Sequence, residues 1–180
     1  SHCLNGSISD SLAGFLRFES HNPMNNRPIL KDPNDRLRKK AEAIGKKELA
    51  SAQIQTLIDD LTQTLYVENG VGLASPQIGV SKRLIVVDVG DGTQALINPK
   101  IISASLRKID FEEGCLSVPG VYGFVRRHRE VKVRALSRDG KEIIIKARGL
   151  LAVVLQHEID HLDGILFIDK VIRFTSPPRL

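Results

Sequence analysis

The chain has 180 residues, of which 42% are hydrophobic and 26% are charged. These values are typical of one globular domain with enough chain to form a core, and no apolar run approaches the roughly twenty residues of a membrane-spanning helix. The net charge of +5 comes from scattered basic residues mixed with acidic ones. We therefore expect a solvated surface and no sequence-specific nucleic-acid recognition, with weak attraction to nucleic-acid phosphates as the alternative.

The first segment, residues 1–23, precedes the only methionine, Met24. It lacks the basic start and long apolar run of a secretory signal, and its two acidic residues argue against an organellar transit segment. We expect natural translation to start at Met24, with residues 1–23 as an extension that takes no part in the chemistry and 24–180 as the working domain. The apolar side chains within 12–18 are the one feature that favours a role for this segment, because they could dock on a neighbouring surface.

The segments that follow show helical and then strand patterns. Apolar side chains at i, i+3, i+4, i+7 and i+11 predict an amphipathic helix that ends before Gly70: Ile54, Leu57, Ile58, Leu61 and Leu65. Segments rich in β-branched residues predict strands over 84–89, 95–98, 100–106, 130–136 and 142–147. Asp139 and Gly140 are typical of a hairpin turn between the last two strands.

Cys115 lies in the segment EEGCLSVP at 112–119, directly after a glycine and four residues before a proline. The segment reads as a strand or the end of a strand. A thiolate there could be a metal ligand that needs the reducing surroundings of the cytoplasm. Taken alone, Cys115 is better explained as a small buried hydrophobic residue, which is the commonest role of a free cysteine.

The segment QHEIDH at 156–161 carries the strongest chemical signal of the chain. In a helix, His157 and His161 lie on one face and can bind one metal ion, while Glu158 can reach a water molecule beside it. The preceding residues 149–155 are apolar on every side, which predicts a buried helix that ends near Gly164. Two core histidines without a metal are the alternative, and a catalytic site needs a third ligand.

The order of these elements indicates the fold class. A helix, many strands and a final helix predict an α+β domain with antiparallel β-sheets wrapped around a central HExxH helix. No internal repeat or low-complexity tract interrupts the order.

Three segments together resemble the peptide deformylase family, in its bacterial type: GVGLASPQ at 70–77, EGCLSVP at 113–119 and QHEIDH at 156–161. A weaker similarity runs from about Pro28 to about Ile172. The resemblance implies hydrolysis of the formyl group from the N-terminal formyl-methionine of new polypeptides in the cytoplasm, with release of formate. It also implies one divalent metal ion, which is ferrous in many members.

Carried over residue by residue, the resemblance assigns roles to the three motifs. It implies that the metal ligands are Cys115, His157 and His161. It implies that the catalytic groups are Glu158, Gln77, the backbone N–H of Leu116, and Gly72. The Gln77 amide stays neutral at every pH, so it suits hydrogen bonding to a developing oxyanion.

The residues expected to bind substrate surround these groups: Gly70, Val71, Glu113, Gly114, Leu150 and Val153. Helical spacing places Leu150 and Val153 on the face of His157, where they could form a wall for a methionine side chain. For Val154, core packing is at least as good an explanation as contact with a ligand. Glu113 and Arg127 are expected to pair and support the site, as corresponding residues do in the family.

Several alternatives accompany this assignment. Thiolate and imidazole ligands also suit zinc, nickel and cobalt. A zinc peptidase would need a third His or Glu in place of Cys115, and a non-catalytic relative would be expected to have lost Glu158 or Gln77. The chain stops soon after Ile168 without the long C-terminal helix of many bacterial members, so ribosome contact through such a helix is not expected. Basic side chains could still meet ribosomal RNA weakly.

Overall fold

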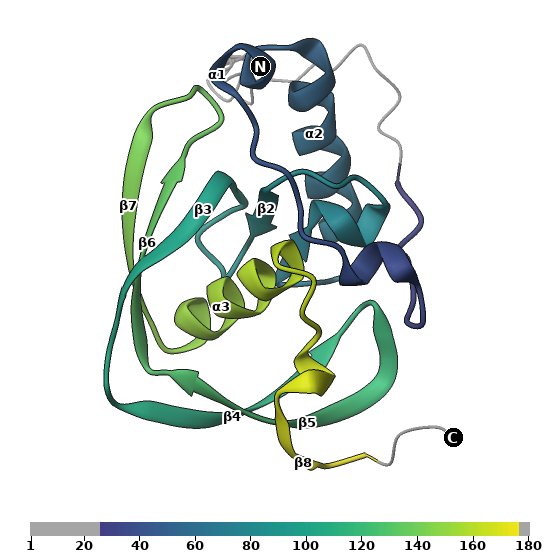
Figure 1. Cartoon of the computed structure of the whole chain (residues 1–180), viewed down its shortest axis with the longest axis vertical. Helices are drawn as coiled ribbons and strands as arrows, with labels where there is room; N and C mark the ends of the chain where they lie inside the picture. Colours follow the sequence, from purple (N-terminus) through teal and green to yellow (C-terminus); the bar gives the residue numbers. More distant parts are fainter. Residues whose placement is uncertain (1–25, 177–180) are drawn as a thin grey trace, which may run out of the picture.

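A computed structural model describes residues 26–176, which form two antiparallel sheets around one helix (Figure 1). The larger sheet has the strand order β1-β2-β3-β6-β7 and the smaller one has the order β4-β5-β8. The strands are β1 (Gly72–Ala74), β2 (Leu84–Val87), β3 (Gln94–Ala104), β4 (Lys108–Cys115), β5 (Val118–His128), β6 (Glu130–Leu136), β7 (Glu142–Arg148) and β8 (Val171–Phe174). The predicted α+β fold with a central helix is confirmed.

The α-helices are α1 (Lys46–Leu49), α2 (Ala52–Val67) and α3 (Leu150–Leu162). The short 3-10 helices are η1 (Asp35–Arg38), η2 (Ser75–Ile78) and η3 (Phe167–Asp169). The predicted amphipathic helix is α2. The Ser51 side chain accepts a hydrogen bond from the backbone N–H of Ile54 at its start. Its end precedes Gly70, as expected. No helix within residues 26–176 is long and apolar enough to cross a membrane.

Strand β2 shows how the core is divided. Its four residues are all buried, and successive strand side chains point to opposite faces. Ile85 and Val87 pack in the cluster that contains α3, whereas Leu84 and Val86 pack in the cluster that contains α2. The larger sheet therefore lies between α3 on one face and α2 on the other at this end.

Helix α3 is almost completely enclosed, as its apolar sequence predicted. Leu155 and Leu162 are fully buried in the cluster between α3 and the larger sheet. Gly149, with φ of 61°, precedes the helix, and Gly164, with φ of 75°, follows it. A Cβ at Gly164 would clash with the backbone of Arg38, so the chain turns there through a residue without a side chain.

The structure corrects the predicted strands in two ways. The predicted strands 95–98 and 100–106 form one strand, β3, which ends at Ala104. Pro99 and a left-handed Asn98 (φ 51°) form an irregularity in its pairing with β6 and not a break. The short strands β1 and β8 were missed, and so were β4 and β5 as full strands. Their acidic residues, glycines and proline weaken any local strand signal, and pairing between distant residues stabilises them.

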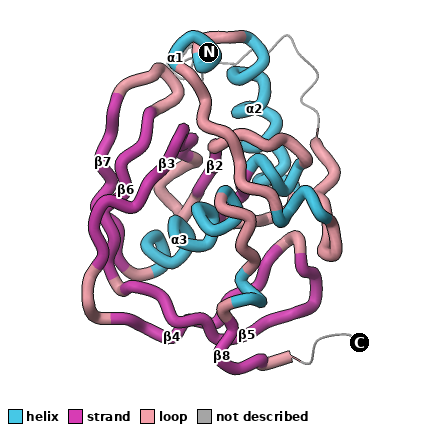
Figure 2. The backbone as a smooth tube through the Cα atoms, in the orientation of Figure 1, coloured by secondary structure: helices cyan, strands magenta, loops and turns pink. Residues whose placement is uncertain are grey.

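The two sheets are joined by short links. Strand β3 runs into β4 through residues 105–107, and β5 runs into β6 through Arg129 (Figure 2). This continuity bends the sheet surface around α3. It brings the end of β4, with Cys115, over the helix that carries the two histidines.

Candidate active site

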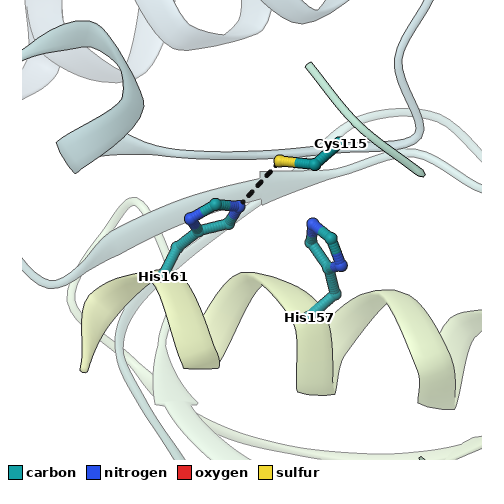
Figure 3. Close-up of side chains that lie close together, drawn as sticks. All are labelled: Cys115, His157 and His161. Carbon is teal, nitrogen blue, oxygen red and sulfur yellow. Dashed lines mark hydrogen bonds between the residues drawn. The ribbon is translucent and has the colours of Figure 1, made fainter. Parts of the chain in front are cut away.

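Cys115, His157 and His161 meet between β4 and α3 (Figure 3). Their ligand atoms all lie within 4.8 Å of one another, and the Cys115 Sγ is 3.2 Å from His161 Nε2. The pairing register of β4 and β5 shifts between Gly114 and Cys115, which turns the strand end at the thiol.

The donor set fits a divalent transition metal. Bond lengths of about 2.3 Å to sulfur and 2.0–2.1 Å to nitrogen place tetrahedral ligand atoms roughly 3.3–3.8 Å apart. The distance of 3.2 Å between Cys115 Sγ and His161 Nε2 is close to that range. Burial lowers the pKa of His161 well below its usual value, so its imidazole is neutral, which is the form that binds a metal. The third ligand atom of this group is a cysteine sulfur, so the site lacks the third His or Glu of the peptidase alternative.

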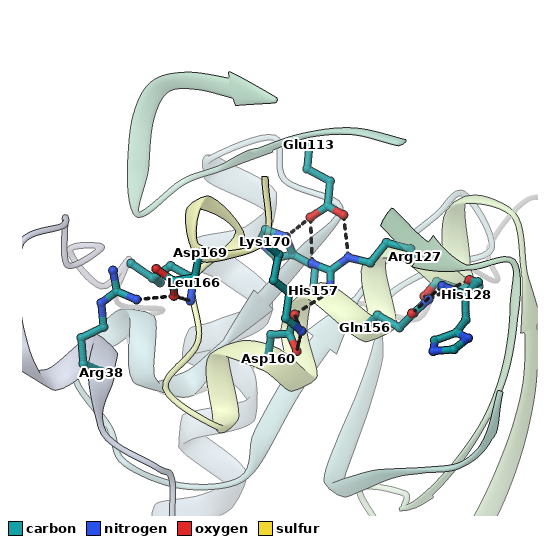
Figure 4. A network of polar contacts seen from close by, with 11 residues as sticks. Arg38, Glu113, Arg127, His128, Gln156, His157, Asp160, Leu166, Asp169 and Lys170 are labelled. Atoms are coloured by element: carbon teal, nitrogen blue, oxygen red, sulfur yellow. Dashed lines mark hydrogen bonds and ion pairs between the residues drawn. The ribbon is translucent and has the colours of Figure 1, made fainter. Parts of the chain in front are cut away.

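His157 is oriented by a buried ion-pair network (Figure 4). Glu113 Oε2 lies 2.7 Å from His157 Nδ1, and Arg127 makes two hydrogen bonds to the same carboxylate, of 2.7 and 3.0 Å. Arg127 also donates to Asp160, which binds Lys170 at the surface. With Nδ1 engaged, the other ring nitrogen of His157 is left for a metal. The expected pair of Glu113 and Arg127 is present.

Glu113 is ionised at neutral pH. Burial raises its pKa, but hydrogen bonds from His157 and Arg127 outweigh that effect and hold the pKa below its usual value. It is therefore an anion that holds His157 by charge as well as by geometry.

Two adjacent arginines of β5 allow a matched stability test. Arg127 and Glu113 have side chains that are 3% and 4% exposed, whereas Arg126 and Asp110 form an equivalent two-bond pair with 58% and 41% exposed. Arg127→Ala leaves a buried carboxylate without its main partner, so we expect a loss of about 3–5 kcal/mol in the free energy of unfolding. Arg126→Ala should cost far less, since solvent screens its pair. Urea unfolding of both variants checks this, and equal losses would contradict it.

Glu158 is the least partnered acid of the site. Its side chain is buried, and Oε2 has no hydrogen-bond partner among the described residues. A Cβ on Gly72 would collide with Oε1 and with Val154, so a glycine is needed for the carboxylate to reach the cleft. Burial raises the pKa of Glu158 to about 7, which suits a group that accepts and returns protons near neutral pH. A bound cation nearby would lower that pKa.

This raised pKa predicts a pH-dependent cost in the metal-free protein. The unfolded chain ionises near the ordinary value of 4.5 and the folded chain at about 7, so stability falls as pH rises between them. Glu158→Gln cannot ionise and should be more stable than the parent at pH 8 by on the order of 3 kcal/mol. At pH 4 the two proteins should be similar. Urea unfolding after chelation tests this, and a difference that does not change with pH would contradict it.

Gln77 is held in η2 with its amide oriented. Its Oε1 accepts a 2.8 Å hydrogen bond from the Ala74 backbone N–H, and its Nε2 donates to Ser117 Oγ at 3.1 Å. The same nitrogen lies 3.7 Å from the Cys115 sulfur. The amide N–H groups are thus directed toward the metal-ligand cluster. Ser117 was missed because nothing in its own sequence context marks it as a partner of Gln77.

A cleft of about 500 Å³ opens over these groups. It is lined by every residue predicted for the site except His161, namely Gly70, Val71, Gly72, Gln77, Glu113, Gly114, Cys115, Leu116, Leu150, Val153, His157 and Glu158. His161 lies beneath, at 1% exposure. Val71 and Leu150 are half exposed at the cleft, as apolar contacts for a ligand would be.

The cleft also contains residues that the sequence did not indicate. Val121 and Tyr122 come from β5, which was not predicted as a strand. Val154, for which core packing was at least as good an explanation as ligand contact, packs in the core and also lines the cleft. Lys31 comes from the segment before η1, and its Nζ donates a 2.6 Å hydrogen bond to the Leu116 carbonyl. No local signal distinguishes Lys31 from other surface lysines.

Comparisons with known proteins agree with this geometry. The profile of the family described as polypeptide deformylase matches residues 26–176. A peptide deformylase of Acetivibrio thermocellus is 53% identical over 152 residues, covering 84% of this chain and 87% of that protein. A crystal structure of a peptide deformylase from Legionella pneumophila has a TM-score of 0.77 at 47% identity, covering 82% of this chain and 86% of that one. A Met-Ala-Ser-bound class I type b peptide deformylase from Acinetobacter baumannii has a TM-score of 0.79 at 35% identity, covering 82% and 99%.

Proposed function

Because this chain belongs to the polypeptide deformylase family, and so removes the N-formyl group from new polypeptides, we propose that Cys115, His157 and His161 hold its metal ion and that Glu158 moves the proton of hydrolysis. The observation that carries this proposal is the convergence of a thiol, two imidazoles and a buried, unpartnered carboxylate at one cleft. We propose residues 24–180 as the catalytic domain.

Ferrous iron is the native ion that we propose, as the family resemblance implies, and the same ligands accept zinc, nickel or cobalt. When bound, a divalent ion acidifies a water molecule and polarises the formyl carbonyl. Glu113 holds His157 in the tautomer that leaves its outer nitrogen for the ion.

The chain's own groups perform the proton transfers and hold the developing charge. A Glu158 carboxylate oxygen accepts the proton of the attacking water and returns it to the leaving amine nitrogen. Gln77 Nε2 and the Leu116 backbone N–H donate hydrogen bonds to the carbonyl oxygen as it becomes negative. The Ala74 and Ser117 contacts hold the Gln77 amide in the donating orientation before substrate arrives.

The apolar wall of the cleft supports recognition of methionine. Val71, Leu150, Val153 and Val154 line it, and their apolar side chains suit contact with an unbranched thioether chain. Gly70 packs closely against the core, since a Cβ there would lie 2.8 Å from the Leu65 side chain. The Acinetobacter baumannii structure has Met-Ala-Ser bound, and we propose that formyl-methionyl peptides bind in the cleft here.

The substrate also suggests where the enzyme works. Formyl-methionyl chains emerge from ribosomes, so we propose action in the cytoplasm and a weak contact with the ribosome. The net charge of +5 supports such a contact through RNA phosphates.

A direct assay tests the proposed function. Protein purified without oxygen and loaded with ferrous iron should release formate from formyl-Met-Ala-Ser and should leave acetyl-Met-Ala-Ser intact, because the extra methyl group crowds the reacting carbon. The parallel measurement of new amino groups distinguishes loss of the formyl group from cleavage of an internal peptide bond. Cleavage between Met and Ala, or no formate release from a metal-loaded sample, would contradict the proposal.

A further inference from the structure

Among residues 26–176, one face of the larger sheet is covered at one end only. Helix α2 packs on β2 through Leu84 and Val86, and the same face continues across β6 to β7. In β6, Val131 and Val133 point into the core with α3, so Lys132 and Arg134 point to the opposite side, where they are exposed. We call this open part of β3, β6 and β7 the basic face.

The basic face carries more cations than anions. Its exposed basic residues are Lys100, Lys132, Arg134, Lys146 and Arg148. Its exposed acidic residues are Glu130 and Glu142. None of these five cations has an ion-pair partner among the described residues, whereas exposed arginines elsewhere, such as Arg126 and Arg138, are paired.

The strand register sets four of these cations beside one another and places Arg148 opposite Glu130. Lys132 is directly opposite Lys146, and Lys100 is directly opposite Arg134. Like charges at opposed positions destabilise a sheet, so this arrangement does not serve the fold. Charges on the edge strand β7 can be explained because they discourage pairing of that edge with another strand. This explanation does not apply to Lys132 and Arg134, which lie on the internal strand β6.

We propose that the basic face binds the phosphate backbone of RNA and holds the enzyme on the ribosome while a new chain reaches the cleft. The ribosomal setting rests on the proposed function. Paired rows of unpartnered lysines and arginines complement the regular negative charge of phosphates, and no base-reading groups are needed. Ile102 and Ile144, which are 42% and 56% exposed, lie on the same strands and could pack against sugars. Since α3 and the cleft lie on the other side of the sheet, RNA bound here leaves the cleft open.

A matched pair of variants of the full chain tests this proposal. The triple variant Lys132→Gln, Arg134→Gln and Lys146→Gln removes three charges from the basic face. The control Lys39→Gln, Lys40→Gln and Lys47→Gln removes three exposed charges elsewhere. Binding to a fluorescein-labelled RNA hairpin is measured by anisotropy between about 50 and 200 mM salt, and binding to purified ribosomes by co-sedimentation. Deformylation of formyl-Met-Ala-Ser is measured for all three proteins.

We expect the face variant to bind at least tenfold more weakly at low salt, and its dependence of log affinity on log salt to be shallower by about 2 to 3. The control should bind nearly as the parent does, and all three should deformylate the free peptide equally. Equal losses in both variants, or parent binding to anionic lipid vesicles but not to RNA, would overturn the inference. Failure to deformylate the free peptide would instead contradict the proposed function alone.

Discussion

Replacing Glu158 with alanine should lower kcat/KM for formyl-Met-Ala-Ser by roughly 10² to 10⁴-fold and leave the metal content unchanged. Glu158 is 4% exposed, its Oε2 has no partner among the described residues, and its pKa is raised to about 7 by burial. No ligand atom of the Cys115, His157 and His161 group belongs to it. Its loss therefore removes proton transfer without removing a metal ligand.

Glu112 is a suitable control for this experiment. It is an exposed carboxylate that also lines the cleft, so Glu112→Ala removes the same charge at the same opening. We expect its kcat/KM to stay close to that of the parent. If Glu158→Ala kept full activity at one metal per chain, the proton would have to move through another group. If it lost the metal as well, the separation of roles proposed here would be wrong.

Replacing Cys115 with alanine should remove the bound metal and, with it, nearly all deformylation. The change takes away the anionic member of a three-ligand set and leaves two imidazoles, which is fewer than the three protein ligands of catalytic sites of this kind. Within residues 26–176, the group of candidate ligand atoms contains no further His, Cys, Asp or Glu, so the group holds no substitute for the thiol. Metal per chain, measured after anaerobic dialysis, should fall from near one to near zero.

Two histidine variants serve as controls for the Cys115→Ala experiment. His161→Ala should lose metal as Cys115→Ala does. His128→Ala should keep it, because His128 lies outside the cluster with its Nδ1 2.6 Å from the Ser105 carbonyl oxygen. Circular dichroism of each variant separates loss of the ligand from loss of the fold. Full metal occupancy in a folded Cys115→Ala protein would exclude the proposed ligand set.

Helices α2 and α3 and the chemical motifs could be predicted from the sequence because their signals are local. The spacing of apolar residues in α2 and the uniformly apolar start of α3 depend on neighbours within a few residues. The HExxH spacing likewise fixes two imidazoles on one helical face whatever surrounds them. The resemblance of three short motifs supplied the role of Cys115, which its own context did not support.

Only the tertiary structure decided which distant groups meet. The pairing of β4 with β5, the contact of Gln77 with Ser117 and the hydrogen bond from Lys31 to Leu116 join residues far apart in the chain. Hydrophobic periodicity does not predict such pairs. It shows which face of a helix or strand a side chain occupies, but not which distant residue that face contacts. By itself, the sequence determined the reacting groups. Folding of the sheets around α3 decided their distances, their burial and the raised pKa of Glu158.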